Sequence, residues 1–243
     1  MSEIELNNVT KSFAQQNVLD GIDLTVEESE TMAVLGRSGV GKSILLKLLI
    51  GLEKPDSGSI CIEGREITGL ATQDLNEIRK RIGFLFQQAA LYDSMTIEQN
   101  IEFPLRRHTK LSRDERRARA KDLLINVGME SELDKLPAEL SGGMRKRVGL
   151  ARALALDPRI VMFDEPTAGL DPVTSAEIDD LILQLKKKRR MTSVIVTHDI
   201  HSAKHISDRV VVLDQGKIVE QGTFSELERS ANPFVMQFLR GRL

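Results

Sequence analysis

A glycine-rich turn near the start of the chain is the feature that most limits how this sequence can fold. Residues 36–43 read Gly36-Arg37-Ser38-Gly39-Val40-Gly41-Lys42-Ser43 and fit the pattern G-x-x-x-x-G-K-[ST] at every specified position. An apolar run over residues 31–35 precedes the turn, and a helical pattern over residues 44–52 follows it. This order predicts a strand, a loop and a helix, in which backbone N–H groups and the positive end of the helix hold a phosphate.

The residue types inside the turn suit the binding of a nucleoside triphosphate. The glycines let the backbone curl so that successive N–H groups face one phosphate. Lys42 is expected to reach the β- and γ-phosphates, and the Ser43 hydroxyl is expected to ligate Mg²⁺. An ordinary glycine turn is the competing interpretation, and the motif alone leaves kinases, GTPases and many ATPases open.

A second chemical signal lies at the end of the apolar run over residues 160–163, where Asp164 and Glu165 follow directly. A buried parallel strand there would place both acids at the carboxyl end of the sheet, beside the phosphate loop. We expect Asp164 to hold the metal, directly or through water, and Glu165 to polarise the attacking water. Alone, such a pair is more often a helix cap or a turn; beside the phosphate loop, the catalytic interpretation is favoured.

The remaining patterns predict one α/β domain over residues 1–243. Alternating apolar and polar residues over 4–10, 21–27 and 58–63 predict a small antiparallel sheet near the N-terminus. Buried-strand runs over 160–163, 192–196 and 210–213 alternate with helical stretches such as 173–185, which predicts a parallel sheet covered on both faces. A mainly helical insert is expected over about residues 88–156, because residues 112–128 are rich in helix formers and place Leu123, Leu124 and Val127 on one side.

Composition narrows the classes of partner. The net charge of −2 gives no overall electrostatic reason to bind nucleic acid, and we expect the basic run over residues 186–190 to be a solvated helix end. No apolar stretch approaches the roughly 20 residues that a membrane-spanning helix needs, and the first ten residues lack the features of a secretory signal. The single Cys61 suits a reducing cytoplasm and is expected to be a small side chain buried in a strand.

A third motif points to a family. Leu140-Ser141-Gly142-Gly143-Met144 resembles the signature loop of ABC ATPases, and Phe86-Gln87, Asp164-Glu165-Pro166 and Thr197-His198-Asp199 resemble further motifs of that family in the same order. The resemblance covers essentially the whole chain. It implies the P-loop NTPase fold of ABC ATPases, which has a parallel sheet core, an N-terminal antiparallel β-subdomain and a helical subdomain, and it implies hydrolysis of ATP.

In that family the signature loop of one protomer completes the phosphate site of the other, so that a head-to-tail homodimer holds two ATP molecules. The residues allow this role, because a hydroxyl and bare amides at the start of a helix form a second anion site. A plain N-cap is the competing interpretation of Ser141, and both can hold together.

The resemblance assigns roles to four more residues. Phe13 matches the aromatic residue that stacks on adenine, although an isolated Phe near a strand end is more often part of a core. Gln87 matches the glutamine that senses Mg²⁺ and the attacking water and couples the site to a permease. Asp171 matches the D-loop aspartate at the dimer interface, with a helix N-cap before Pro172 as the alternative. His198 matches the switch histidine that contacts the γ-phosphate, with a structural role as the alternative.

The motifs and the resemblance together predict the following site residues. They are Glu165, His198 and Gln87 for catalysis; Phe13, Gly36, Ser38, Gly39, Gly41, Lys42, Ser43, Ile44, Ser141, Gly142, Gly143 and Asp171 for nucleotide binding; and Ser43, Gln87 and Asp164 for the metal.

Two residues depart from the family pattern. Ile44 stands where many relatives have Thr, so a hydroxyl contact to the α-phosphate is missing, which weakens nucleotide binding by about 0.5–1.5 kcal/mol if one hydrogen bond is lost. Met144 replaces the common Gln of the signature. Since Ser141 and Gly143 supply the phosphate contacts there, Met144 does not imply inactivity.

The sequence around Gln87 indicates a branch of this family. Residues 86–96 and 100–106, together with Arg145-Lys146-Arg147 after the signature, resemble the Mla or MCE branch, which moves phospholipids between bacterial membranes. The resemblance implies a transmembrane permease, an MCE lipid-binding protein and, in some systems, a STAS-like subunit as partners, with the chain peripheral on the cytoplasmic face of the inner membrane.

Two other functions stay open at this point. One is an ABC ATPase of translation, DNA repair or Fe–S assembly that has no permease; those acting on nucleic acid usually carry a duplicated cassette, a long coiled-coil insert or a basic surface, and this sequence has none of them. The other is a kinase or GTPase with the same phosphate loop, which the signature disfavours.

Overall fold

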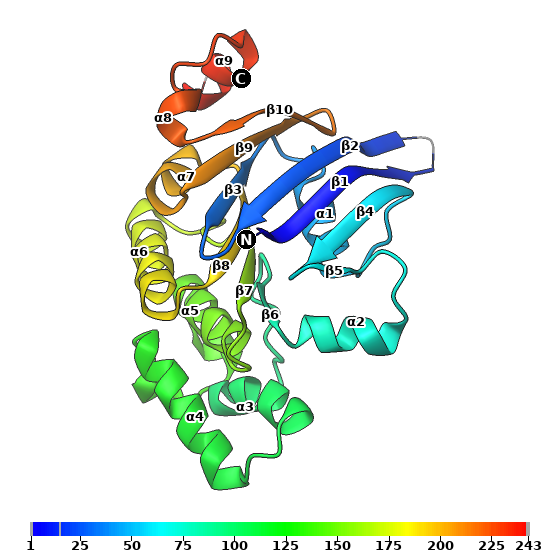
Figure 1. The fold of residues 1–243 in the computed structure, drawn as a ribbon. Helices are drawn as coiled ribbons and strands as arrows, with labels where there is room; N and C mark the ends of the chain where they lie inside the picture. The colour runs from blue at the N-terminus through cyan, green and yellow to red at the C-terminus, as the bar shows by residue number, and fades with distance from the viewer. Residues whose placement is uncertain (1, 15, 242–243) are drawn as a thin grey trace.

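The computed structural model describes residues 2–14 and 16–241, and its strands form two sheets (Figure 1). The smaller sheet has four strands in the order β2-β1-β4-β5, and each neighbouring pair is antiparallel. This confirms the antiparallel sheet predicted near the N-terminus. Its strands are β1 (Ser2–Phe13), β2 (Gln16–Glu27), β4 (Ser57–Ile62) and β5 (Arg65–Glu66).

The larger sheet has six strands in the order β10-β9-β3-β8-β7-β6. Five of them are parallel, as predicted, and β10 pairs with β9 in the antiparallel direction. The antiparallel edge was not predicted; it is made by a two-residue hairpin turn in which Gln215 and Gly216 both have positive φ. The strands are β3 (Thr31–Leu35), β6 (Ile82–Leu85), β7 (Ile160–Asp164), β8 (Thr192–Thr197), β9 (Arg209–Asp214) and β10 (Lys217–Gly222).

The helices lie around the two sheets (Figure 1). The helices α3 (Ile97–His108), α4 (Arg113–Asn126) and α5 (Gly142–Ala153) lie together at the green end of the ribbon. Short 3₁₀ turns, η1 (Glu130–Glu132) and η2 (Pro137–Glu139), lie between α4 and α5. The others are α1 (Lys42–Leu49), α2 (Thr72–Arg79), α6 (Pro172–Arg189), α7 (Ile200–Ile206), α8 (Phe224–Leu227) and α9 (Pro233–Leu239).

Alternation along the central strands explains why both faces of the larger sheet are covered. In β7, Ile160 and Met162 belong to the core shared with the smaller sheet and α1, whereas Val161 and Phe163 belong to the core shared with α3 to α6. Successive side chains of a strand point to opposite faces, so a strand that packs on both sides must be apolar throughout. Leu123, Leu124 and Val127 of the predicted helical stretch are buried in the second of these cores.

The C-terminal helix α9 packs on the chain's own sheet. Val235 and Phe238 are buried and join Val210 and Val212 of β9 in a third apolar core. Within the described residues, this segment therefore packs on its own chain; residues 242 and 243 lie outside them.

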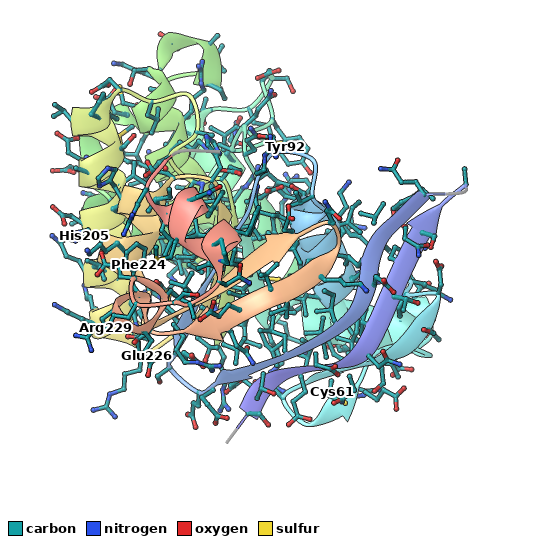
Figure 2. All side chains as sticks on the ribbon, turned by 90° about the horizontal axis from the view of Figure 1, so that it is seen from above. Cys61, Tyr92, His205, Phe224, Glu226 and Arg229 are labelled. Atoms are coloured by element: carbon teal, nitrogen blue, oxygen red, sulfur yellow. The ribbon has the colours of Figure 1, made fainter. Side chains whose placement is uncertain are left out.

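The burial predicted for Cys61 is wrong. It was predicted to be buried, but it is partly exposed on β4, because its neighbours Ile60 and Ile62 occupy the core-facing positions and alternation turns Cys61 to the other face. Figure 2 shows Cys61 on the smaller sheet, at the opposite side of the molecule from His205 and Phe224.

Among the residues that the structure describes, no helix has the length and apolar character needed to cross a bilayer.

Candidate functional site

The loop between β3 and α1 forms the predicted phosphate cradle. Gly41 is the N-cap of α1 with φ of 105°, and a Cβ atom there would lie 2.8 Å from the carbonyl oxygen of Val18. A residue with a side chain would therefore be strained and crowded at this position. Because no side chain caps the first turn of α1, its N–H groups can bind an anion.

Lys42 holds its ammonium on the inner side of this loop. The side chain is 6% exposed, and Nζ donates hydrogen bonds to the carbonyl oxygens of Gly36 at 2.7 Å and Arg37 at 3.1 Å. Glu165 Oε1 lies 3.5 Å from Nζ. Burial lowers the pKa of Lys42, and the negative charges of Glu165 and Asp164 act in the opposite direction. The positive charge is therefore placed inside the cradle and faced by a carboxylate.

Asp164, at the end of β7, lies beside the cradle as the sequence predicts. Its Oδ1 accepts a hydrogen bond from Ser43 Oγ at 2.9 Å. Burial raises the pKa of Asp164, and the bond from Ser43 opposes that effect. Two of the three predicted metal ligands are thus in direct contact.

Glu165 follows β7 in a left-handed conformation, with φ of 49°. Its Oε2 lies 2.9 Å from Nδ1 of His198 and accepts a hydrogen bond from the His198 backbone N–H at 3.3 Å. The Glu165 side chain is 12% exposed, whereas that of His198 is 57% exposed. The carboxylate is therefore held from one side by His198 and faced from the other by Lys42.

These groups surround one cavity of about 500 Å³. Most predicted site residues line it, together with Gln16 and Val18, which the sequence did not indicate. The lining residues are Phe13, Gln16, Val18, Ser38, Gly39, Gly41, Lys42, Ser43, Ile44, Gln87, Glu165 and His198.

Phe13 and Ile44 need separate comment. Phe13 is 41% exposed and faces this cavity, with Lys11 Nζ 5.1 Å from the ring centre, so the core alternative does not hold. Ile44 lines the cavity and also packs against the main core, where a threonine would bury less apolar surface.

Ser141 and Asp171 do not line this cavity. Ser141 Oγ accepts a hydrogen bond from the Met144 backbone N–H at 3.2 Å and caps α5. Asp171 Oδ1 accepts from the backbone N–H groups of Val173 and Thr174, both at 3.1 Å, and caps α6. Both residues are N-caps, and in one chain the signature lies apart from the cradle.

Lys146 on α5 was not predicted as a site residue, but its side chain contacts the backbone of two residues of the site. It is 4% exposed, and its Nζ donates hydrogen bonds to the carbonyl oxygens of Glu165, at 2.9 Å, and of Gln87. Burial lowers the pKa of Lys146 to about 8. The neighbouring Arg145 and Arg147 are also basic but are more exposed. The sequence alone does not show which of the three basic residues is buried.

The predicted metal ligands fit Mg²⁺. Ser43, Asp164 and Gln87 offer a hydroxyl, a carboxylate and an amide oxygen, which are the hard ligands that this ion prefers. Ser43 and Asp164 are in contact, and Gln87 lines the same cavity as Ser43.

Comparison with known proteins identifies the family of this chain. A family model described as "ABC transporter" matches residues 19–168, a range that includes the cradle, the signature and the Asp164-Glu165 pair. The chain belongs to the ABC transporter family. It is the ATP-binding subunit of such a transporter, and its ATPase activity is coupled to transport.

Three curated relatives match most of this chain. The "Probable ribonucleotide transport ATP-binding protein mkl" of Mycobacterium tuberculosis is 44% identical over 98% of this chain and 67% of its own length. The "Methionine import ATP-binding protein MetN" of Rhizobium johnstonii is 44% identical over 90% of this chain and 60% of its own length. The "Intermembrane phospholipid transport system ATP-binding protein MlaF" of Haemophilus influenzae is 38% identical over 98% of this chain and 90% of its own length.

A solved structure confirms the ABC ATPase fold. The dimeric ATP-binding cassette MJ0796, in a post-hydrolysis state bound to ADP and Pi, matches with a TM-score of 0.84 and 35% identity. The match covers 90% of this chain and 98% of that one.

Proposed function

We propose that this subunit powers the movement of phospholipids between bacterial membranes, from the cytoplasmic face of the inner membrane. The observation that carries this substrate class is the match to MlaF, which spans 98% of this chain and 90% of the relative. The mkl and MetN relatives are more similar in sequence, at 44% identity, but this chain spans only 67% and 60% of their lengths. Of these three relatives, the one named for phospholipid transport is the one that this chain matches over the largest share of its length.

Within each site we assign the cradle and Lys42 to the phosphates of ATP. The open N–H groups of α1 and the buried ammonium would neutralise charge on the triphosphate, and Phe13 would stack on the adenine from its exposed position at the cavity wall. Ser43, Asp164 and Gln87 would hold Mg²⁺, which supplies further neutralisation of the phosphate oxygens when bound.

We assign Glu165 as the group that orients and polarises the attacking water. Its carboxylate lines the cavity beside Lys42, and the bond to His198 fixes its direction. A general base must lie within hydrogen-bond reach of the proton that it takes, and Glu165 is the side chain that combines this reach with a held orientation. His198 would contact the γ-phosphate from its exposed position.

The position of the signature supports a two-chain site. Ser141, Gly142 and Gly143 begin α5 but do not line the cavity, so one chain alone leaves its cradle open. We propose that a second copy closes it in the ATP-bound state, with Asp171 at the same interface. The dimeric state of MJ0796 supports this arrangement.

A groove beside Gln87 is the proposed docking place of the permease. It has a volume of about 390 Å³ and is lined by exposed aromatic residues, Phe86 and Tyr92, together with Phe103 of α3. Exposed aromatic side chains at the rim of a pocket are typical anchors of protein interfaces. Since Phe86 directly precedes Gln87, movement of a bound permease segment would reach the site through one peptide unit.

Reconstitution tests the substrate class. We expect the subunit to co-purify with a polytopic permease and an MCE protein, with or without a STAS-like subunit, and the complex in proteoliposomes to transfer labelled phospholipid to acceptor vesicles in the presence of ATP. ATPase stimulation by methionine or ribonucleotides, with none by phospholipid, would instead assign the substrate class named for MetN or mkl.

A further inference from the structure

Helix α5 connects two parts of the proposed mechanism. Its first residues are the signature, which would act on the partner's nucleotide. Further along the same helix, Lys146, Gly149 and Arg152 follow at intervals of three residues and therefore share one side of the helix. That side faces the Gln87 segment of the same chain.

Lys146 is the contact closest to the chemistry. Its ammonium is almost fully buried and hydrogen-bonds the carbonyl oxygens of both Gln87 and Glu165. Glu165 has a positive φ, which is uncommon for a residue with a side chain, so a bond to its carbonyl helps to hold the strained peptide. One side chain thus fixes the backbone of both Gln87 and Glu165.

Gly149 and Arg152 also contact the segment that contains Gln87. A Cβ atom at Gly149 would lie 2.8 Å from Leu85 Cδ1 and 2.9 Å from Ala89 Cβ, so the helix and the segment are in close contact. Arg152 donates hydrogen bonds to the carbonyl oxygens of Ala89, at 2.7 Å, and Ala90, at 2.8 Å. Any shift of α5 therefore carries the segment 85–90 with it.

The energetics of Lys146 indicate a functional role. Burying an ammonium is costly, and an apolar side chain of similar volume would fill the same space without that cost. Both carbonyl acceptors belong to residues of the proposed site, and neither is part of a regular helix or strand that needs the bond.

We propose that Lys146 is a positioning residue that links the signature end of α5 to Glu165 and Gln87 of its own chain. When the partner's nucleotide engages the signature, the movement of α5 aligns the carboxylate in the site of the same chain, so that the two sites of the dimer act together. This inference rests on the proposed roles of Glu165 and Gln87.

Two substitutions in the full-length protein test the link. Lys146→Met keeps the volume and removes both hydrogen bonds, and we expect kcat for ATP to fall about 10- to 100-fold, while the affinity for ATP stays within about threefold. Lys146→Gln retains two N–H donors on its amide, one for each carbonyl, and should keep most of the turnover. Lys121→Met, on the exposed side of α4, is the matched control and should behave as wild type.

Two results would overturn the proposal. One is near wild-type kcat in Lys146→Met, and the other is a loss in Lys146→Gln as large as that in Lys146→Met. If Lys146→Met does not fold, amide hydrogen exchange replaces it: in ATP-bound protein with Lys146 intact, Ser141→Arg should raise exchange at residues 86–90, 164 and 165, and unchanged exchange there contradicts the link.

Mixed dimers locate the site on which Lys146 acts. In a dimer of one Glu165→Gln chain and one wild-type chain, a single site keeps its catalytic carboxylate. Adding Lys146→Met to the otherwise wild-type chain should lower the remaining turnover about 10- to 100-fold, because Lys146 supports Glu165 of its own chain. Retained turnover would mean that Lys146 serves the partner's site.

The Glu165→Gln homodimer separates the two possible failures. If that homodimer keeps turning over ATP, the proposed role of Glu165 is wrong. If it is inactive and Lys146→Met is fully active, only the role of Lys146 is wrong.

Discussion

Single residues in the site are held largely by backbone atoms. Lys42 binds two carbonyl oxygens of its own loop, and Glu165 accepts a bond from the His198 backbone N–H. Backbone partners do not change when neighbouring side chains change, so these contacts fix charge positions before nucleotide binds. Such fixed dipoles and charges are what stabilise a charged transition state.

Glu165→Gln should separate binding from turnover. The amide keeps the shape of the side chain but cannot accept the water's proton, so kcat should fall about 10²- to 10⁴-fold. ATP affinity should be unchanged or higher, because a negative charge near the phosphates is removed. Steady-state ATPase assays and equilibrium nucleotide binding check this, with the exposed Glu28→Gln as control; turnover close to wild type would refute the assignment.

Asp179 should make stability depend on pH. It is 5% exposed on α6, accepts a bond from Ser202 Oγ at 2.7 Å, and burial raises its pKa from 3.8 to about 6. Between these pH values the folded protein keeps a proton that the unfolded chain loses, so this group lowers stability as pH rises, and the penalty is complete above about pH 6.

Asp179→Asn removes that penalty while keeping an acceptor for Ser202. We expect the free energy of unfolding of the variant to exceed that of wild type by about 1–3 kcal/mol at about pH 7.5. The gain should disappear near the unfolded pKa of 3.8. Urea unfolding at several pH values measures the difference, and a gain that does not vary with pH would contradict the assigned cause.

At the scale of elements, continuous apolar runs were the most predictable part of the fold. Residues 31–35 were predicted as a strand and form β3 with the same bounds, because every one of the five side chains is buried. The helix after the cradle was placed two residues late and extended too far, since the pattern does not reveal that α1 starts at Lys42 and that the chain turns after Leu49.

Weakly apolar elements were missed for a physical reason. The helix α2 buries only Leu75 and Ile78, and β10 has no fully buried residue, so each offers few apolar side chains by which the sequence could reveal it. The neighbouring residues 215 and 216 form a hairpin turn that could have indicated β10, but Gln-Gly is a weaker signal than Asn-Gly.

Lys146 and Gln16 mark the limit of reading the site from sequence. Motifs name residues that lie close together along the chain, and they predicted most of the cavity wall. Lys146 contacts Gln87 and Glu165 only because folding brings three distant segments together. Its burial depends on these tertiary contacts and cannot be predicted from the neighbouring residues alone.

The C-terminal helix α9 should contribute measurably to stability. Phe238 is 7% exposed in the third core, so Phe238→Ala should cost about 3 kcal/mol, near the low end for buried Phe because α9 is a short helix that can relax around the substitution. The exposed Gln237→Ala should change stability by less than about 0.5 kcal/mol. Chemical unfolding of both variants measures this, and equal effects would show that α9 does not dock as described.

At the scale of the whole molecule, we propose two functional surfaces on the described chain. One is the nucleotide cavity, which lacks the signature of its own chain, and the other is the aromatic groove beside Gln87. The two surfaces meet at Phe86 and Gln87. This arrangement explains how docking of a permease and closure of a dimer can affect the same residues.

Tyr92→Ala should test the groove without disturbing the nucleotide site. The Tyr92 ring is exposed and packs on Phe103 at 4.8 Å, while the backbone of residue 92 is held by Asn100 and stays in place. We expect permease binding to weaken by about 1–2 kcal/mol and transport to fall with it. Nucleotide affinity of the isolated subunit is the control, and unaltered permease binding would exclude Tyr92 from the interface.

Complementation between two inactive chains tests the shared site most directly. Lys42→Ala disables the cradle and Ser141→Arg blocks the signature, so each homodimer should fail to hydrolyse bound ATP in a single turnover. If each site combines two chains, the mixed dimer contains one intact site, made from the unaltered cradle of one chain and the unaltered signature of the other. We predict hydrolysis of about one ATP per mixed dimer, more slowly than at a wild-type site because the chain that supplies the intact cradle has a blocked signature; a mixed dimer as inactive as both parents would contradict the shared site.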